Sequence, residues 1–226
     1  MITKIGHRGA KGYVVENTLA SFQKAINLGV NGIELDVHCC ASGELVVFHD
    51  FTLDRLTNGT GAISNFSLSE LKKIKIDNDY EIPTLVEVLQ LVNKKCFLNV
   101  ELKGKQTAEP VFQLLLKYMN EQNWQPTDFI VSSFQFDELK QFASFQSEIP
   151  LAILTQASVN QAIEWAQQFN AKAIHPHFSL LTKENCTKAK DFGLQINTWT
   201  VNEYAAIEYI KRFEIDGIIS DFPDRI

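Results

Sequence analysis

The chain has 226 residues, of which 45% are hydrophobic and 21% are charged, and its formal net charge is −6. This length and composition suit one globular domain with a substantial core, so we expect residues 1–226 to form a single domain. The negative charge disfavours nucleic acid or an anionic membrane surface as the main partner, and no apolar stretch reaches the roughly 20 residues that cross a bilayer.

Apolar runs typical of strands alternate along the chain with amphipathic segments typical of helices. The predicted strands are residues 3–6, 32–38, 96–103, 129–133, 151–154, 172–175, 195–200 and 217–220. The predicted helices are residues 19–28, 85–93, 108–121, 136–145, 159–169, 183–192 and 203–213. This alternation predicts an α/β fold, the (β/α)8 or TIM barrel, with functional groups at the C-terminal ends of the strands. An open doubly wound sheet is the alternative, but it does not gather polar groups from so many strands at one mouth.

The first predicted strand leads directly into His7, and Arg8 follows between this histidine and a glycine. A histidine exchanges protons near neutral pH, which makes His7 a candidate general acid or base. The guanidinium group of Arg8 has the bidentate geometry that binds phosphate. An ion pair between Arg8 and Glu16 is the structural alternative.

The predicted strand at residues 32–38 has an unusual polar face. Apolar residues alternate there with Glu34, Asp36 and His38. Because strand side chains alternate between two faces, these three polar groups share one face. A parallel strand covered on both sides is normally apolar throughout. We therefore interpret Glu34 and Asp36 as functional residues and His38 as a supporting or packing residue.

The segment after this strand breaks the alternation of strands and helices. Residues 44–50 are a predicted hairpin return, and residues of about 51–82 form a predicted small insertion after the second strand. Loops of this length that have little periodicity are usually functional. His49 lies at the end of the return. Two histidines at one mouth can divide the general base and general acid roles between them.

The predicted strand at residues 96–103 repeats the polar face, since its apolar residues alternate with Asn99, Glu101 and Lys103. Buried carboxylates are unfavourable unless they are paired or bind a metal. Glu101 and the two carboxylates of the second strand offer hard oxygen ligands, which suit Mg²⁺ or Ca²⁺. Lys103 is a candidate phosphate contact. The alternative is a metal-free network, in which Lys103 pairs with Glu101 or Asp36.

Three further polar or aromatic residues lie near later strand ends. Trp199 lies in the predicted strand at residues 195–200 and is a candidate wall of the substrate cavity. Core packing is the alternative for this side chain. His175 and His177 flank a proline near the sixth strand, and we interpret both as structural.

The four cysteines form no CxxC pair, and the chain enters a strand pattern at its first residues. The cysteine spacing is a poor disulfide framework. The early strand pattern leaves no room for a signal peptide. We therefore expect reduced thiols and a cytoplasmic location. Whether copies of the chain associate into a homo-oligomer is left open.

Taken in order, these motifs resemble the glycerophosphodiester phosphodiesterase family. The resemblance extends from residue 5 to residue 223 and depends on the ordered set, because each string alone is weak. The matching strings are His7-Arg8-Gly9, Glu16-Asn17-Thr18, Glu34-x-Asp36-Val37, His49-Asp50, Arg55-x-Thr57 with Gly59 and Gly61, Ile82-Pro83-Thr84-Leu85, Glu101-Leu102-Lys103, Trp199-Thr200-Val201-Asn202 and Asp216-Gly217-Ile218-Ile219-Ser220-Asp221.

The resemblance implies a TIM barrel that hydrolyses small-molecule glycerophosphodiesters to sn-glycerol 3-phosphate and an alcohol, with a divalent cation as cofactor. The family's roles are carried over to the matching positions of this chain. The implied catalytic histidines are His7 and His49, the metal ligands Glu34, Asp36 and Glu101, and the phosphate contacts Arg8 and Lys103.

Three other functions are compatible with parts of this pattern. A lysophospholipase D on the same barrel would need an apolar groove for an acyl chain, and the short insertion offers no clear one. A barrel aldolase would use Lys103 as a Schiff-base amine, but the neighbouring Glu101 should keep the pKa of that amine high. A barrel that only binds phosphodiesters would not need the complete catalytic set.

Overall fold

The computed structural model describes residues 1–77 and 79–226, and its eight parallel strands confirm the predicted (β/α)8 barrel. These strands are β1 (Thr3–His7), β2 (Gly32–Cys39), β6 (Phe97–Leu102), β7 (Phe129–Ser133), β8 (Leu151–Thr155), β9 (Ala173–Pro176), β10 (Gln195–Thr198) and β11 (Gly217–Ser220). Each strand pairs with its neighbours in this order, and β11 pairs back with β1, so the sheet closes on itself.

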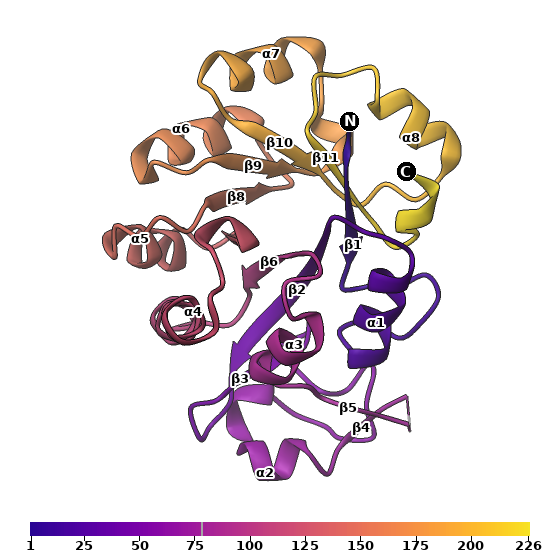
Figure 1. The fold of residues 1–226 in the computed structure, drawn as a ribbon, viewed down its shortest axis with the longest axis vertical. Coiled ribbons are helices and arrows are strands. Elements are labelled where there is room, and N and C mark those ends of the chain that lie inside the picture. Colours follow the sequence, from indigo (N-terminus) through magenta and orange to yellow (C-terminus); the bar gives the residue numbers. More distant parts are fainter. Residues whose placement is uncertain (78) are drawn as a thin grey trace.

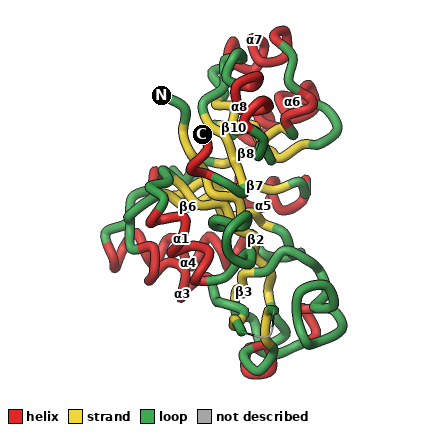
Figure 2. Tube along the Cα trace, turned by 90° about the vertical axis from the view of Figure 1, so that its right-hand side faces the viewer, coloured by secondary structure: helices red, strands yellow, loops and turns green. Residues whose placement is uncertain are grey.

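Helices connect the strands and lie around the outside of the sheet (Figures 1 and 2). They are α1 (Leu19–Asn27), α3 (Leu85–Val92), α4 (Ala108–Gln122), α5 (Phe136–Ser144), α6 (Val159–Phe169), α7 (Lys183–Asp191) and α8 (Tyr204–Ile210). Short 3-10 turns occur at η1 (Ile63–Asn65), η2 (Pro126–Asp128), η3 (Phe178–Leu180) and η4 (Pro223–Arg225). Among residues 1–77 and 79–226, no helix combines the length and the apolar character needed to cross a membrane.

The two faces of the barrel strands carry different residues, as the alternation in β2 predicts. Ile33, Leu35 and Val37 are fully buried in the hydrophobic core that packs the strands against the helices. The carboxylates of Glu34 and Asp36 therefore point to the opposite face, which is the interior of the barrel. The functional groups consequently share a restricted space that the helices do not reach.

The predicted hairpin return is confirmed by β3 (Leu45–Val47), which pairs antiparallel with β2. The chain then forms η1, α2 (Leu68–Leu71) and the two-stranded β4 (Lys75–Ile76) and β5 (Tyr80–Glu81) before it enters α3. Figures 1 and 2 show this segment beside the barrel. It has its own small core, which consists of Cys40, Val46, Phe48, Leu53, Ile63, Leu71, Ile76 and Ile82.

Two predicted strands are longer than the observed ones. β6 ends at Leu102, so Lys103 lies just beyond the strand, and β10 ends at Thr198, so Trp199 also follows its strand. At both positions the regular strand ends at the mouth of the barrel, with one last backbone contact to the neighbouring strand: Lys103 N–H donates to the carbonyl oxygen of Val37 at 3.2 Å and Trp199 N–H to that of Pro176 at 3.3 Å. Both side chains therefore belong to the loops that surround the mouth.

A polar layer lies inside the barrel around His175, which is fully buried on β9. Its two ring nitrogens lie 3.5 Å from Asn99 Nδ2 and 3.1 Å from Asn197 Nδ2. Burial lowers the pKa of His175 to about 3, so its imidazole is neutral at physiological pH. This histidine is a hydrogen-bonded core residue.

Candidate active site

Seven of the eight predicted site residues line one cavity of about 320 Å³ at the C-terminal ends of the barrel strands. The eighth, Asp36, is buried next to them. Additional walls come from aromatic, aliphatic and amide side chains that the sequence did not single out. The complete lining is His7, Arg8, Glu34, His49, Glu101, Lys103, Phe134, Leu154, Gln156, Trp199 and Ile219.

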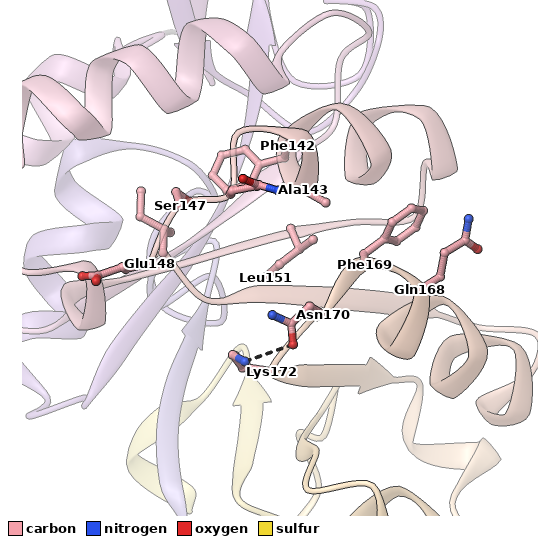
Figure 3. A pocket seen from close by; sticks show the side chains of 11 residues that line it. Phe142, Ala143, Ser147, Glu148, Leu151, Gln168, Phe169, Asn170 and Lys172 are labelled. Carbon is pink, nitrogen blue, oxygen red and sulfur yellow. Dashed lines mark hydrogen bonds between the residues drawn. The ribbon is translucent and has the colours of Figure 1, made fainter.

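A larger hollow of about 670 Å³ lies at the opposite ends of the strands (Figure 3). Leu151 at the start of β8 and Lys172 just before β9 both line it, together with Phe169 and Asn170. The ammonium of Lys172 donates a hydrogen bond to Asn170 at 3.3 Å. TIM barrels carry their active sites at the other face. The smaller cavity is therefore the candidate active site.

The three carboxylates predicted to bind a cation are close together inside the barrel mouth. Glu34, Asp36 and Glu101 each offer an oxygen, and these oxygens lie within 4.8 Å of one another. β2 and β6 bring them together, since Asp36 and Glu101 are register partners on adjacent strands. All three side chains are buried. Such proximity of buried anions is unfavourable unless positive charge compensates it.

The proximity of the three buried carboxylates shifts their pKa values. Burial first, and then the charges of Asp36 and Glu101, raise the pKa of Glu34 well above its ordinary range. Burial and Asp36 likewise raise the pKa of Glu101 to about 7, against the opposing effect of Lys103. Burial would raise the pKa of Asp36 as well, but Arg8 and then Lys103 outweigh it and lower this pKa. Asp36 is therefore the anion around which the basic residues gather.

Arg8, Asn17 and Lys103 surround Asp36. The amide of Asn17 donates to Asp36 Oδ2 at 2.9 Å, and Arg8 Nε lies 3.4 Å from the same oxygen. The ammonium of Lys103 lies 3.5 Å from Asp36 Oδ1 and donates to Glu101 Oε1 at 3.0 Å. The backbone N–H of Arg8 donates to Glu34 Oε2 at 3.0 Å. Both ion pairs that the sequence offered as alternatives for Lys103 are thus present.

The residues of the cluster fit a divalent cation. Asp36 Oδ1 is buried and has no hydrogen-bond partner among the described residues, which is unusual for a carboxylate oxygen. Carboxylate oxygens are the ligands that Mg²⁺ and Ca²⁺ prefer. A dication would also relieve the repulsion that raises the pKa values of Glu34 and Glu101. Glu34, Asp36 and Glu101 can therefore hold such an ion.

His7 is fixed by a carboxylate from the other end of the chain. Its Nδ1 lies 2.5 Å from Asp221 Oδ1, and Asp221 Oδ2 accepts a hydrogen bond from Asn202 at 2.8 Å. Burial opposes ionisation of Asp221, but the hydrogen bond from His7 outweighs it and lowers the pKa of Asp221. An ionised carboxylate only accepts, so the proton of the imidazole sits on Nδ1 and Nε2 is left for chemistry.

His49 has an equivalent arrangement built from nearby residues. Its Nδ1 lies 2.6 Å from Asp50 Oδ1, and Arg55 donates to both oxygens of Asp50. Burial lowers the pKa of His49 and also that of His7, although the carboxylate partners oppose this effect. Near neutral pH both imidazoles are therefore largely neutral and able to accept a proton at Nε2.

Trp199 forms part of the cavity wall and is itself held in place. Its indole Nε1 donates to the carbonyl oxygen of His175 at 2.7 Å. Its ring meets the ring of Phe134 edge-on, with centroids 5.6 Å apart. His38, by contrast, does not line the cavity. Its Nε2 lies 3.4 Å from the carbonyl oxygen of His49, so it supports the backbone of that histidine.

Asp221, Asp50 and Asn17, which contact His7, His49 and Asp36, were not singled out from the sequence. Asp50, Asp221 and Asn17 occur in the motif strings, but nothing in a strand pattern indicates what they contact. Phe134 and Gln156, which line the cavity, lie just beyond β7 and β8. Their position after barrel strands is the signal that could have identified them.

The barrel mouth combines two imidazoles with buried carboxylates and basic groups in one cavity, an arrangement that suits an enzyme acting on an anionic substrate. Residues 7–225 match the glycerophosphoryl diester phosphodiesterase family. The chain is 35% identical to a glycerophosphodiester phosphodiesterase of Caldanaerobacter subterraneus subsp. tengcongensis, over 98% of this chain and 95% of that protein. It is 34% identical to a glycerophosphodiester phosphodiesterase of Bacillus altitudinis, over 99% and 96% of the two chains. The chain thus belongs to the glycerophosphoryl diester phosphodiesterase family and is a phosphoric diester hydrolase.

Solved structures agree with this assignment. An Oleispira antarctica phosphodiesterase, in complex with the product sn-glycerol-3-phosphate, superposes with a TM-score of 0.90 at 27% identity, over 99% of this chain and 94% of that one. A glycerophosphodiester phosphodiesterase from Thermotoga maritima gives a TM-score of 0.81 at 30% identity, over 99% and 96% of the two chains.

Proposed function

We propose that this enzyme hydrolyses glycerophosphodiesters to sn-glycerol 3-phosphate and an alcohol. The observation that carries the proposal is that two imidazoles, each fixed at Nδ1 by a carboxylate, line the same cavity as the acidic cluster. The similar Oleispira antarctica phosphodiesterase binds the product sn-glycerol-3-phosphate, which supports the choice of substrate. The substrate is accordingly a small molecule.

We propose that His7 and His49 are the acid–base pair. One imidazole, in its neutral form, accepts the proton of the attacking hydroxyl group at Nε2. The other acts in its imidazolium form, with protons on both ring nitrogens, and donates the Nε2 proton to the departing alkoxide. The attacking hydroxyl belongs either to water or to the glycerol 2-position. In the second case the attack releases the alcohol and forms a cyclic phosphate, which water then opens to sn-glycerol 3-phosphate. Asp221 and Asp50 hold the rings in orientation and stabilise the imidazolium form when it arises.

In the same proposal, Glu34, Asp36 and Glu101 hold a divalent cation, Mg²⁺ or Ca²⁺. When bound, such a cation supplies Lewis-acid polarisation of a phosphoryl oxygen. Arg8 and Lys103 line the cavity and bear positive charge, so they would contact the remaining phosphoryl oxygens. Trp199 forms the apolar wall against which the substrate packs.

The test measures release of sn-glycerol 3-phosphate from a panel of glycerophosphodiesters, with Mg²⁺, with Ca²⁺ and with EDTA. We expect activity that EDTA abolishes and that His7→Ala and His49→Ala each lower by about 10²- to 10⁴-fold. Circular dichroism of both variants serves as the control for folding. Near-normal turnover in either folded variant refutes the acid–base assignment.

Including lysophosphatidylcholine in the panel tests the lysophospholipase D alternative. The cavity measures about 320 Å³, which is at the lower end of the range for small-molecule sites. We therefore expect glycerophosphodiesters without an acyl chain to be the better substrates. A higher kcat/KM for lysophosphatidylcholine would favour the alternative.

A further inference from the structure

A chain of charged side chains runs from the insertion to the active-site cavity. It starts at Arg55, which follows β3 and lies within the insertion. Arg55 Nε donates to Asp50 Oδ2 at 2.5 Å, and its Nη2 donates to Asp50 Oδ1 at 3.0 Å. Both oxygens of Asp50 are thus engaged by one planar group, which fixes the plane of the carboxylate. Asp50 Oδ1 is also the atom that contacts His49 Nδ1.

The guanidinium of Arg55 is itself anchored by Glu16. Its Nη2 donates to Glu16 Oε1 at 2.7 Å, and Arg8 Nη1 donates to the same oxygen at 2.7 Å. The side chain of Glu16 is only 5% exposed, whereas that of Arg55 is 47% exposed. A buried carboxylate holds its cationic partners firmly, because leaving it unpaired would be costly. The guanidinium group of Arg55 is therefore tied to the same carboxylate oxygen as that of Arg8.

We propose that Arg55 is a positioning residue that orients the acid–base histidine His49 by fixing the plane of Asp50. This inference rests on the proposed function, since it assigns Arg55 to the reaction through the role of His49. Without the guanidinium group, Asp50 would keep a partner on one oxygen and would be free to rotate. The imidazole would then spend less time with Nε2 directed into the cavity.

The small apolar core of the insertion does not include Arg55. This core is formed by other residues, among them Leu53, Ile63 and Ile76. The insertion also contains an ion pair that is remote from the cavity lining, between Lys75 Nζ and Glu81 Oε1 at 2.9 Å. Lys75→Ala therefore offers a matched control, because it also removes a cation and an ion pair from the insertion.

The test is a double-variant cycle on kcat for glycerophosphodiester hydrolysis. We expect Arg55→Ala to lower kcat by about 10- to 100-fold with little change in KM, as for residues that orient catalytic groups. Asp50→Asn should lower kcat by at least as much. In the double variant kcat should fall no further than in Asp50→Asn alone, because Arg55 acts through Asp50. Lys75→Ala should leave both constants unchanged.

Chemical rescue separates positioning from a structural role. Guanidinium, added well below denaturing concentrations, should restore part of kcat in Arg55→Ala and have no effect on Lys75→Ala. Arg55→Lys keeps the charge but cannot bind both carboxylate oxygens in a fork, so we expect an intermediate kcat. This variant also keeps the test decisive if Arg55→Ala does not fold.

Three results would overturn the inference. The first is a wild-type kcat in Arg55→Ala or, if that variant does not fold, in Arg55→Lys. The second is multiplicative losses of kcat in the double-variant cycle, and the third is a rise in KM with kcat unchanged.

His49→Ala, measured alongside, separates failure of the positioning role from failure of the proposed function. If His49→Ala is inactive and the Arg55 variants behave as wild type, only the positioning role fails. If His49→Ala is active, the acid–base assignment itself fails.

Discussion

Replacing Glu101 with glutamine should stabilise the cation-free protein at alkaline pH. Glu101 is 6% exposed, and its pKa rises from the ordinary 4.5 to about 7 because of burial and the charge of Asp36. The folded state therefore binds this proton more tightly than the unfolded state. The contribution of Glu101 to the free energy of unfolding is therefore fully present below pH 4.5 and is lost as the pH rises through about 7. The difference of pKa corresponds to about 3 kcal/mol.

The assay is thermal unfolding in EDTA at pH 5.5 and pH 8.0, for the wild type and for Glu101→Gln. For a protein of this size about 3 kcal/mol corresponds to roughly 6–12 °C in Tm. Part of this loss has already occurred at pH 5.5, because the unfolded-state pKa is 4.5. Between the two pH values we therefore expect the wild type to lose about 2 kcal/mol, or roughly 4–8 °C in Tm, more than the variant. Saturating Mg²⁺ or Ca²⁺ should remove the wild type's penalty at pH 8.0, and it should do little for the variant. Equal pH dependence of the two proteins in EDTA would refute the reasoning.

Three other substitutions test separate contacts. Lys103→Met should raise KM for the phosphodiester by about 10- to 100-fold in steady-state kinetics, since it removes the proposed charge-assisted contact between the ammonium group and a phosphoryl oxygen. Gln135→Ala removes an amide that donates to the carbonyl groups of residues 102–104 at 3.2, 2.7 and 3.4 Å. Urea denaturation should show a loss of about 1–3 kcal/mol. In Gly12→Ala the new Cβ would lie 2.3 Å from the ring of Phe222. The melting temperature should fall, and adding Phe222→Ala should recover part of it.

The barrel and most of its mouth could be predicted because they depend on local periodicity. Apolar residues on one face of β2 and β6 must pack against helices, so Glu34, Asp36 and Glu101 had to point into the barrel. The closed sheet confirms this interpretation. The three carboxylates lie together for the same reason, since β2 and β6 are adjacent and in register.

The contacts that orient His7 and Arg55 could not be predicted, since they join distant parts of the chain. Asp221 approaches His7 only after the barrel has closed, and Glu16 meets Arg55 across the boundary of the insertion. Strand ends were also uncertain. Trp199 continues the pattern of β10, and the regular strand ends one residue before it.

The pairing of β1 with β11 has a consequence for how the protein is made. His7 leaves the ribosome well before its partner Asp221, which follows 214 residues later. Until β11 has emerged, the nascent sheet has two open edges, at β1 and β10. The contact that orients His7, one of the two proposed acid–base residues, therefore forms only after β11 has been translated. We expect a chain truncated before β11 to be inactive and prone to associate through those edges.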